Sequence, residues 1–364
     1  MTKPRPPVDY AEYLKLDRLL SCQSPKSVEC GQPAHDELLF VIVHQAYELW
    51  FKQVLHELDS VLALFRADSV DERSIGVALA RLARVTEIQK LLVDQLRVLE
   101  TMTPLDFLDF RDLLLPASGF QSLQFRLIEN KLGLRPEQRA ATEKSRGGAA
   151  LTPEAKEALR ASESEPSLFA VVERWLERTP FLETPGFQFW ASYARAVDAM
   201  LARDREAIAS NSTLGDADKR LQLAELDRTA ASFSAVLDEG AHARLVATGQ
   251  RRLSWRATQA ALFIHLYRDQ PILHLPFRFL TILVDVDELL ATWRYRHALM
   301  VHRMIGTKIG TGGSSGHHYL LGTVERNKVF KDLYDLSTFL ISRSSLPALP
   351  PEMERRLGFH YPRG

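Results

Sequence analysis

Apolar residues recur every three or four positions along most of the chain, which is the spacing of one face of an α-helix. Residues 74–100 show this spacing most fully, in a row that includes Ile75, Leu82, Leu92 and Leu99. No segment alternates between apolar and polar positions for long, no Asn-Gly turn separates β-branched runs, and no internal repeat occurs. The pattern therefore predicts an all-α fold, a bundle-like packing of helices on helices around one core.

The same spacing predicts ten long helices with short breaks between them. They cover residues 33–64, 74–100, 104–114, 120–131, 168–182, 187–209, 216–237, 255–269, 277–304 and 319–342. Pro33 suits a first helical position, and Ser254 suits an N-cap. Pro271 and Pro276 are expected to kink the approach to helix 277–304.

One helix start carries an especially complete local signal. Thr103 is a favourable N-cap, Pro104 suits the first helical position, and Asp106 lies where a capping box needs an acceptor. These three residues predict that a helix begins sharply at residue 104.

Composition divides the chain into an arm, one domain and a tail. Residues 1–20 are expected to form an N-terminal arm, and residues 21–346 a single helical domain. Scattered charges and glycines indicate that residues 132–167 form either a polar, partly helical excursion or a flexible polar insertion, and prolines mark a tail at 347–364.

The arm contains a short amphipathic stripe. Tyr10, Tyr13 and Leu14 lie at positions i, i+3 and i+4, so they share one face of a helix. Either this face packs on the protein's own core, or it reaches a neighbouring subunit. The pattern alone favours the first interpretation, because most apolar stripes face their own core.

The bulk composition excludes several classes of protein. The 364 residues are 46% hydrophobic and 25% charged, and 46 basic residues balance 46 acidic ones. That balance provides no basic surface for nucleic acid or an anionic membrane. No apolar run is long enough for a signal peptide or a membrane span, so we expect a cytoplasmic protein. Cys22 and Cys30 are expected to be free thiols.

Two polar residues interrupt apolar helix faces. His44 shares a face with Phe40, Tyr47 and Phe51, where it is either a hydrogen-bonded core histidine or a functional one. Arg111 stands one turn after an aromatic residue in helix 104–114. An arginine on an apolar face either forms a buried ion pair or binds an anion in a pocket.

The stretch from 293 to 316 joins a helix to a glycine-serine loop. His297 and His302 are five residues apart, so they lie about 140° apart around the helix and do not easily share one metal. The loop at 306–316 lacks the Gly-Lys-Ser/Thr ending of a phosphate-binding loop and follows no strand. We interpret it as a lid beside a helix-borne histidine.

Four long motifs extend the analysis beyond periodicity. In chain order they are YAEYLKLD (10–17), HDELLFVIVHQAYELWFKQVLHEL (35–58), TPLDFLDFRDLLLPASGFQSLQFRLIENKLG (103–133) and WRYRHALMVHRMIGTKIGTGGSSGHHYL (293–320). Together they resemble the tryptophan 2,3-dioxygenase family, a group of haem-dependent enzymes. The resemblance covers most of the chain outside residues 132–167 and the termini.

The resemblance implies a role for each of five residues. His297 matches the axial ligand of the haem iron, and His44 matches the distal histidine that faces the indole nitrogen. Phe40 matches a wall of the indole pocket, and Arg111 matches the clamp on the substrate carboxylate. Phe107 occupies a substrate-binding position where some family members carry a tyrosine, so that hydroxyl is absent here.

Five further substrate-binding positions follow from the same resemblance. Thr311 matches a loop threonine near the substrate ammonium, and Ser118 lies in a segment near the haem. Tyr10, Tyr13 and Leu14 match an arm that enters the active site of the adjacent subunit. The resemblance therefore reverses the interpretation of the arm that the pattern favours, and it implies a homo-oligomer, specifically a homotetramer.

The implied reaction is the first step of tryptophan degradation by the kynurenine pathway. One haem b per subunit, with O₂ as co-substrate, would cleave the indole C2–C3 bond of L-tryptophan to give N-formyl-L-kynurenine. We expect His44 to take part as a hydrogen-bond partner of the indole N–H. An imidazole with a pKa near 6.5 is poorly matched to deprotonating so weak an acid.

Three other functions remain open from the sequence. The same chemistry could act on a modified tryptophan in a secondary pathway, with the ring pocket changed. A haem sensor without turnover would keep His297 but would not need Phe40, Arg111 and Thr311 together. A purely structural helical oligomer would need none of these residues.

Overall fold

The computed structural model describes residues 7–138, 151–180, 188–308 and 316–358. Every regular element within these ranges is a helix or a 3₁₀ turn, and no strand occurs in them. The predicted all-α class is therefore confirmed.

The helices differ widely in length. Their bounds are α1 Tyr10–Leu14, α2 Leu16–Leu19, α3 Lys26–Glu29, α4 Glu37–Phe65, α5 Glu72–Leu99, α6 Pro104–Arg111, α7 Leu123–Leu132, α9 Pro153–Ser164, α10 Leu168–Glu177, α11 Phe189–Ser210, α12 Asp216–Leu237, α13 Glu239–Ala247, α14 Trp255–Leu266, α15 Pro271–Ile305, α16 Gly316–Arg326, α17 Lys331–Asp335 and α18 Pro351–Leu357.

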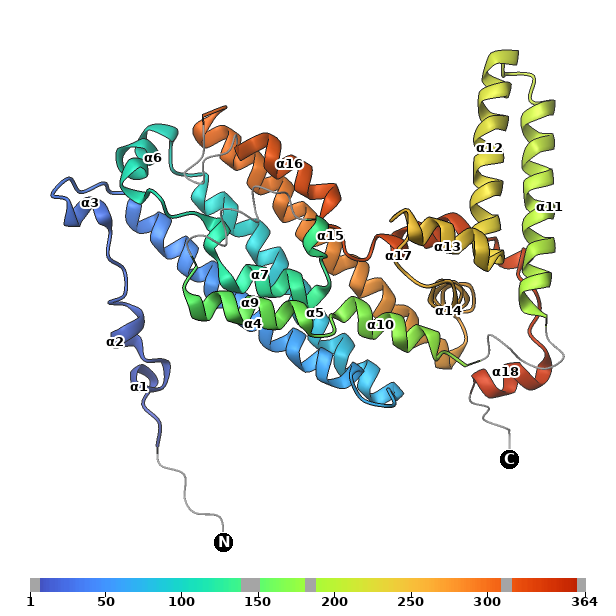
Figure 1. Cartoon of the computed structure of the whole chain (residues 1–364), viewed down its shortest axis with the longest axis horizontal. Coiled ribbons are helices and arrows are strands. Elements are labelled where there is room, and N and C mark those ends of the chain that lie inside the picture. The colour runs from blue at the N-terminus through green and yellow to red at the C-terminus, as the bar shows by residue number, and fades with distance from the viewer. Residues whose placement is uncertain (1–6, 139–150, 181–187, 309–315, 359–364) are drawn as a thin grey trace, which may run out of the picture.

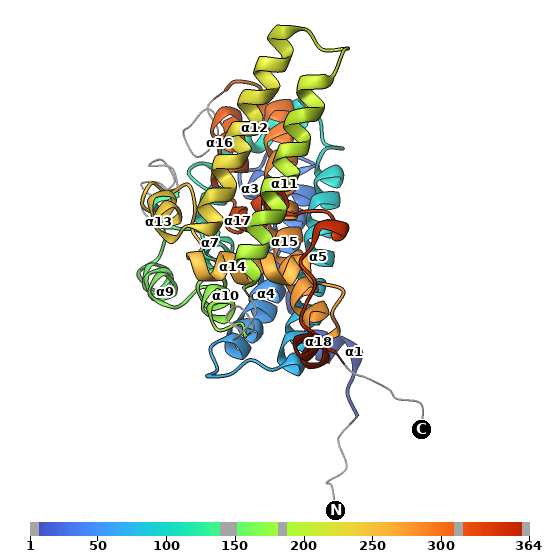
Figure 2. The same cartoon turned by 90° about the vertical axis from the view of Figure 1, so that its right-hand side faces the viewer.

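Three long helices organise the body of the molecule. Helix α5 packs against both α4 and α15, while α7 lies on α4 and α16 lies on α15 (Figure 1). The residues that these helices bury are mostly Leu, Val, Ile and Phe, as their spacing predicts. Helices α11 and α12 pair as a hairpin, which projects from the end of the molecule opposite α3 and α6 (Figures 1 and 2).

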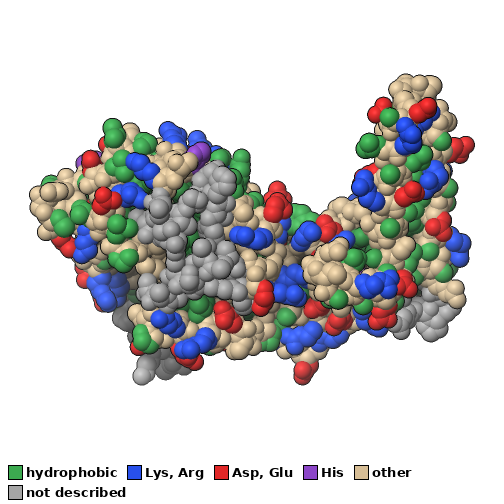
Figure 3. Space-filling model, turned by 45° about the horizontal axis from the view of Figure 1, so that its top comes forward, with side chains coloured by type: hydrophobic (Ala, Val, Ile, Leu, Met, Phe, Trp, Pro, Cys, Tyr) green, Lys and Arg blue, Asp and Glu red, His purple; other side chains and the backbone are tan. Residues whose placement is uncertain are grey.

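Charges of both signs are interspersed over the face in Figure 3, in keeping with the balanced composition. Within the described residues, no helix combines the length and apolar character needed to span a bilayer. Cys22 and Cys30 are exposed free thiols, which confirms that expectation.

Helix α4 begins later than predicted. The segment around Pro33 is not helical, and its neighbours bind the preceding helix α3. The Glu37 carboxylate accepts hydrogen bonds from the backbone N–H groups of Lys26 and Ser27 at 2.7 and 2.8 Å. The backbone N–H of Ala34 donates to the Ser27 hydroxyl at 2.9 Å. These contacts bind α3 to the start of α4, so the helix starts at Glu37.

The start of α6 is as predicted. Thr103 and Asp106 form both halves of the capping box, and Pro104 occupies the first helical position. Ser254 caps α14 by accepting from the N–H of Ala257, as its position in the sequence indicates.

The prediction that α15 begins after two proline kinks is wrong. The helix runs 35 residues from Pro271, with Pro276 inside it. Pro271 lies in the first turn, where a backbone N–H has no acceptor within the helix, so its absence in proline costs no helical hydrogen bond. Pro276 lies near the same end and is buried, so the helix continues through it with the loss of one backbone hydrogen bond.

The C-terminal part is more broken than the predicted helix 319–342. Helix α16 ends at Arg326 and α17 starts at Lys331. Between them the buried Asp287 carboxylate accepts from the N–H groups of Val329 and Phe330 at 3.1 and 2.9 Å. These bonds from α15 satisfy backbone groups that a continuous helix would have paired internally.

Three further segments contain helices. Helix α13 was not predicted, and the tail predicted from 347 contains α18, which buries Met353 and Leu357. The predicted insertion contains α9, while its residues 139–150 lie outside the described part of the chain.

Candidate active site

His44 lies on α4 with one ring nitrogen already engaged. Its Nδ1–H donates to the carbonyl oxygen of Phe40 at 2.7 Å, so in the neutral ring Nε2 carries the free lone pair. The residue keeps an exposed surface, yet the protein packed around the ring disfavours the imidazolium and lowers the pKa of His44. The histidine therefore offers a neutral hydrogen-bond acceptor to whatever lies beside it.

Three phenylalanines make an apolar wall next to this histidine. The Phe40 ring lies 4.1 Å from that of His44, between ring centroids, and 5.7 Å from that of Phe107 in a stacked arrangement. Phe110 meets both phenylalanines edge-on, at 5.6 and 5.4 Å. Phe40 of α4 and Phe107 of α6, both partly exposed, thus form an aromatic surface suited to a flat apolar group, and the fully buried Phe110 lies behind them.

Arg111 ends α6 one turn after Phe107, so its guanidinium emerges beside the aromatic wall. Its side chain is only 16% exposed, and it contacts the Asp112 carboxylate at 3.3 Å. Asp112 is 81% exposed, so water screens this contact strongly. The pair with Asp112 is therefore not the buried ion pair considered as an alternative.

His297 lies on α15, where the charge state of His44 influences it. Desolvation and, to a smaller extent, the nearby His44, whose imidazolium charge would repel a second one, together lower the pKa of His297 to about 4. The two histidines, from α15 and α4, are therefore within electrostatic reach of each other. His302, on another face of α15, is exposed, as the predicted angular separation requires.

Comparison with known sequences decides the family. A profile of the family described as tryptophan 2,3-dioxygenase matches residues 4–340. This chain belongs to the tryptophan 2,3-dioxygenase family. It is 54% identical to the tryptophan 2,3-dioxygenase of Bdellovibrio bacteriovorus over 98% of this chain and 99% of that one.

Relatives from distant organisms show the same agreement. Tryptophan 2,3-dioxygenase from Dictyostelium discoideum is 49% identical over 97% of this chain and 88% of its own, and that from Aedes aegypti is 50% identical over 96% and 89%. The family predicted from the four motifs is confirmed, and with it the enzyme class, an oxidoreductase of tryptophan catabolism.

The donor set between α4 and α15 fits the haem that this family implies. Among the described residues, no group of three or more His, Cys, Asp and Glu side chains could hold a metal ion alone. A haem brings four nitrogen ligands of its own and needs one neutral imidazole from the protein, a requirement that His297 could meet. The phenylalanine wall and the uncharged His44 would remain available to a substrate.

The structure brings together only part of the predicted site. His44, Phe40, Phe107 and Arg111 lie on two adjoining helices, and His297 approaches from a third. Ser118 lies in the turn after α6, where its hydroxyl accepts from the N–H of Phe120 at 3.4 Å. The predicted loop residue Thr311 lies outside the described residues.

The arm residues do not contact this site within the subunit. Tyr10 and Tyr13 are each 72% exposed and Leu14 is 41% exposed, on a segment that extends away from the helical body (Figure 1). The pattern-based interpretation that the stripe packs on its own core is therefore wrong.

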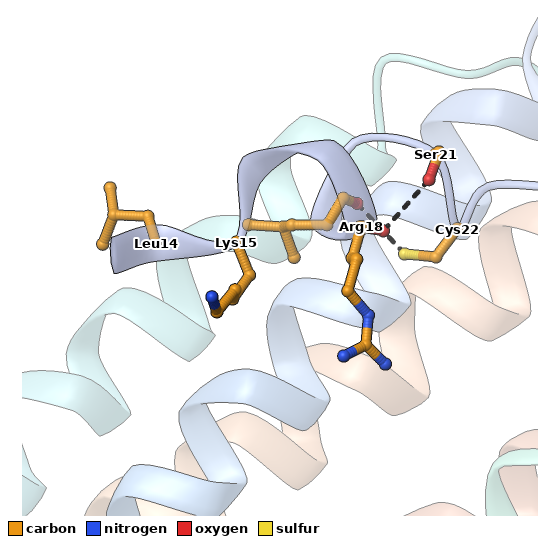
Figure 4. Close-up of a pocket in the computed structure, with 6 residues that line it drawn as sticks. Leu14, Lys15, Arg18, Ser21 and Cys22 are labelled. Carbon is orange, nitrogen blue, oxygen red and sulfur yellow. Dashed lines mark hydrogen bonds between the residues drawn. The ribbon is translucent and has the colours of Figure 1, made fainter. Parts of the chain in front are cut away.

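A surface pocket lies on the arm itself (Figure 4). Residues 14–22 alone line it, and its bonds are local: the Ser21 hydroxyl donates to the Arg18 carbonyl at 3.4 Å, and the Cys22 thiol donates to the Leu19 carbonyl at 3.0 Å. None of its lining residues comes from the helices that carry the histidines, so the pocket is not part of the candidate active site.

Two residues with no role predicted from the sequence support His297: Trp293 contacts it, and Tyr47 contacts Trp293. Trp293 stacks on the His297 ring at 5.1 Å, and the Trp293 indole N–H donates to the Tyr47 hydroxyl at 3.4 Å. The signal for the first contact was present, because Trp293 precedes His297 by one helical turn. The second contact joins residues 246 positions apart, which no local pattern reveals.

Proposed function

We propose that this protein holds one haem b between His297 and His44 and uses O₂ to cleave the C2–C3 bond of L-tryptophan, giving N-formyl-L-kynurenine. The observation that carries the proposal is the pair of neutral histidines on α15 and α4: a charge on His44 would lower the pKa of His297, and the phenylalanine wall adjoins His44. Family membership supports the same reaction.

His297 is suited to be the iron ligand. Only a neutral imidazole has the lone pair that coordinates a metal, and the lowered pKa of His297 keeps it neutral at physiological pH. The haem supplies the activation of O₂, which amino-acid side chains do not achieve. The protein's own residues bind and orient the substrate.

His44 is suited to receive the indole N–H. Because Nδ1 donates to Phe40, the free Nε2 lone pair can accept a hydrogen bond from the substrate ring. The lowered pKa of His44 makes the ring an even weaker base, so it orients the indole and does not remove its proton.

Arg111 and the phenylalanine wall would fix the two ends of the substrate. The guanidinium can form paired hydrogen bonds with the carboxylate, while Phe40 and Phe107 contact the flat ring. Holding both ends would fix the orientation of the reacting bond, which is the main contribution that a protein makes to such a reaction.

The arm supports a homotetramer with shared active sites. Tyr10, Tyr13 and Leu14 expose apolar surface that the subunit's own body does not cover. The arm is attached where the Gln23 and Gln45 side chains bond at 2.8 Å, and α1 lies beyond that point. We place this stripe over the substrate pocket of the adjacent subunit. Co-expressed Arg111→Ala and Tyr13→Ala subunits should then form mixed tetramers with some intact sites and regain activity that neither variant has alone.

We place the enzyme in the cytoplasm. The two exposed cysteines are both free thiols, which is the usual state in a reducing compartment.

An absorption assay tests the reaction. Haem-loaded, reduced protein is mixed with L-tryptophan and air, and the N-formyl-L-kynurenine band is followed. Product in a 1:1 ratio to consumed O₂ supports the proposal. A haem spectrum with no product from L-tryptophan would contradict it and would favour a modified indole substrate or a sensor.

A further inference from the structure

The ring of His297 lies flat against the indole of Trp293. Their centroids are 5.1 Å apart and their planes differ by only 8°, so the two rings are stacked. Both side chains project from α15 one turn apart, and this spacing places them on the same face. The stack restricts rotation of the imidazole about its bond to the backbone.

Trp293 is itself held in place by neighbouring helices. Its Nε1–H donates to the hydroxyl of Tyr47 on α4 at 3.4 Å, and that hydroxyl donates to the backbone carbonyl of Leu92 on α5 at 2.6 Å. The rings of Tyr47 and Phe125 also pack on the indole, at 6.1 and 5.3 Å. A continuous chain of contacts therefore links the imidazole to the backbone of α5.

Tyr47 is suited to link Trp293 to the backbone of α5. It is buried, and desolvation raises the pKa of its hydroxyl to about 12, so the hydroxyl keeps its proton and donates permanently to Leu92. Its oxygen remains available to accept from Trp293.

A metal-binding histidine usually donates its second N–H to a carboxylate or a carbonyl, and that bond sets the ring plane. Within the described residues, the ring of His297 makes no such bond, and its ordered contact is the stack on Trp293. The aromatic contact thus occupies the place that a hydrogen-bonding partner takes in many metal sites.

We propose that Trp293 and Tyr47 are positioning residues for the haem ligand: the indole face of Trp293 sets the imidazole plane of His297, and the Tyr47 hydroxyl anchors that indole to α5. The inference rests on the proposed function, since it requires His297 to bind the iron. Neither residue touches the substrate; both act through His297.

Three variants separate the contacts that link His297 to α5. Trp293→Leu removes both the stack and the N–H, Trp293→Phe keeps an aromatic face without the N–H, and Tyr47→Phe removes only the anchoring hydroxyl. Tyr334→Phe is a matched control, because the Tyr334 hydroxyl also donates to a backbone carbonyl, that of Val284 on α15, at 3.0 Å. The haem-loaded ferrous variants are compared by resonance Raman spectroscopy of the iron–histidine stretch and by haem transfer to apomyoglobin.

We expect Trp293→Leu to shift and broaden the iron–histidine band and to weaken haem binding by about 10- to 100-fold, the usual effect of losing a ligand's supporting contact. Trp293→Phe and Tyr47→Phe should give smaller shifts of the band, and Tyr334→Phe none. Tyr47→Phe preserves the apolar packing, so it tests the idea even if Trp293→Leu fails to fold.

Two results would overturn the inference. One is a wild-type band and wild-type haem affinity in Trp293→Leu and Tyr47→Phe; the other is an equal shift in Tyr334→Phe. His297→Ala separates this failure from failure of the proposed site. If His297→Ala keeps the band, the assignment of His297 as the iron ligand is wrong. If His297→Ala loses the band while the Trp293 and Tyr47 variants keep the wild-type band, the ligand assignment stands and only the positioning roles of Trp293 and Tyr47 are wrong.

Discussion

The two histidines of the candidate site are held in different ways. His44 is tied by one nitrogen to its own helix, through the Phe40 carbonyl, and keeps an exposed surface beside the phenylalanine wall. His297 lies against Trp293, whose contacts extend into α4 and α5. The first arrangement leaves a nitrogen available to a ligand that comes and goes, and the second restrains a ring that must stay in place.

This difference shows how similar chemistry can serve separate roles. Desolvation lowers the pKa of both imidazoles, so both are neutral at pH 7. A permanent iron ligand needs a fixed ring plane, whereas a substrate contact needs an open lone pair. The proposed assignment of His297 to iron and His44 to substrate agrees with the way in which each ring is held.

Replacing the restrained histidine should have the largest effect. His297→Ala removes the only protein ligand proposed for the iron, so the purified protein should lose stable haem binding and with it all activity. His302→Ala, on the same helix but on an exposed face, is the control and should bind haem normally. The Soret band measures both, and a normal band in His297→Ala would invalidate the assignment.

Arg111→Ala, which removes the proposed contact with the substrate carboxylate, should have the second-largest effect. Loss of two charge-assisted hydrogen bonds, each worth about 1.5–3 kcal/mol, should raise the KM for L-tryptophan by at least about 100-fold. Haem content should not change, because Arg111 adjoins the wall and not the ligand. Arg343→Ala, which loses an exposed ion pair with Asp269, should behave as the wild type. An unchanged KM in Arg111→Ala would show that the carboxylate binds elsewhere.

Acid should weaken the haem-free fold through His297. Its folded pKa is about 4, against about 6.5 in an unfolded chain, so between these values only the unfolded chain binds the proton. The free energy of unfolding should therefore fall as the pH drops from 6.5 to 4, by about 2 kcal/mol from this residue. Urea unfolding at several pH values measures it. The slope should be shallower in His297→Ala than in His302→Ala, and equal slopes would contradict the assignment.

The smallest effect is expected at His44. His44→Ala removes one neutral hydrogen bond of about 0.5–1.5 kcal/mol, so kcat/KM should fall only about 2- to 10-fold. His44→Asn can restore an acceptor and should recover part of the loss. Steady-state kinetics distinguish this role from general-base catalysis, which would make the loss in both variants far larger.

Local signals in the sequence were sufficient for some elements. Thr103, Pro104 and Asp106 predicted the start of α6 correctly, because a capping box involves only residues within one turn. The helical spacing of α5 and α12 likewise predicted their extents closely, since each buries one face on neighbouring helices.

Other features depend on contacts between distant segments. Helix α4 begins at Glu37 because that carboxylate binds the backbone of α3, and helix 319–342 breaks because Asp287 binds backbone groups near Phe330. Amphipathic spacing in the arm predicted α1, but it could not indicate whether its apolar face is covered by the same subunit.

In the candidate site, too, residues within sequence motifs were predicted and contacts between distant segments were not. The resemblance identified His44, Arg111 and His297 because each stands in a long motif. The supporting contact between Trp293 and Tyr47 was not predicted, since it depends on the packing of α15 against α4.

The most direct test of the division between the histidines is the iron–histidine stretch of the ferrous haem protein, measured by resonance Raman spectroscopy in three forms. We expect the band in the wild type and in His44→Ala, and no band in His297→Ala supplied with excess haem. A band that persists in His297→Ala, or that disappears in His44→Ala, would contradict this division.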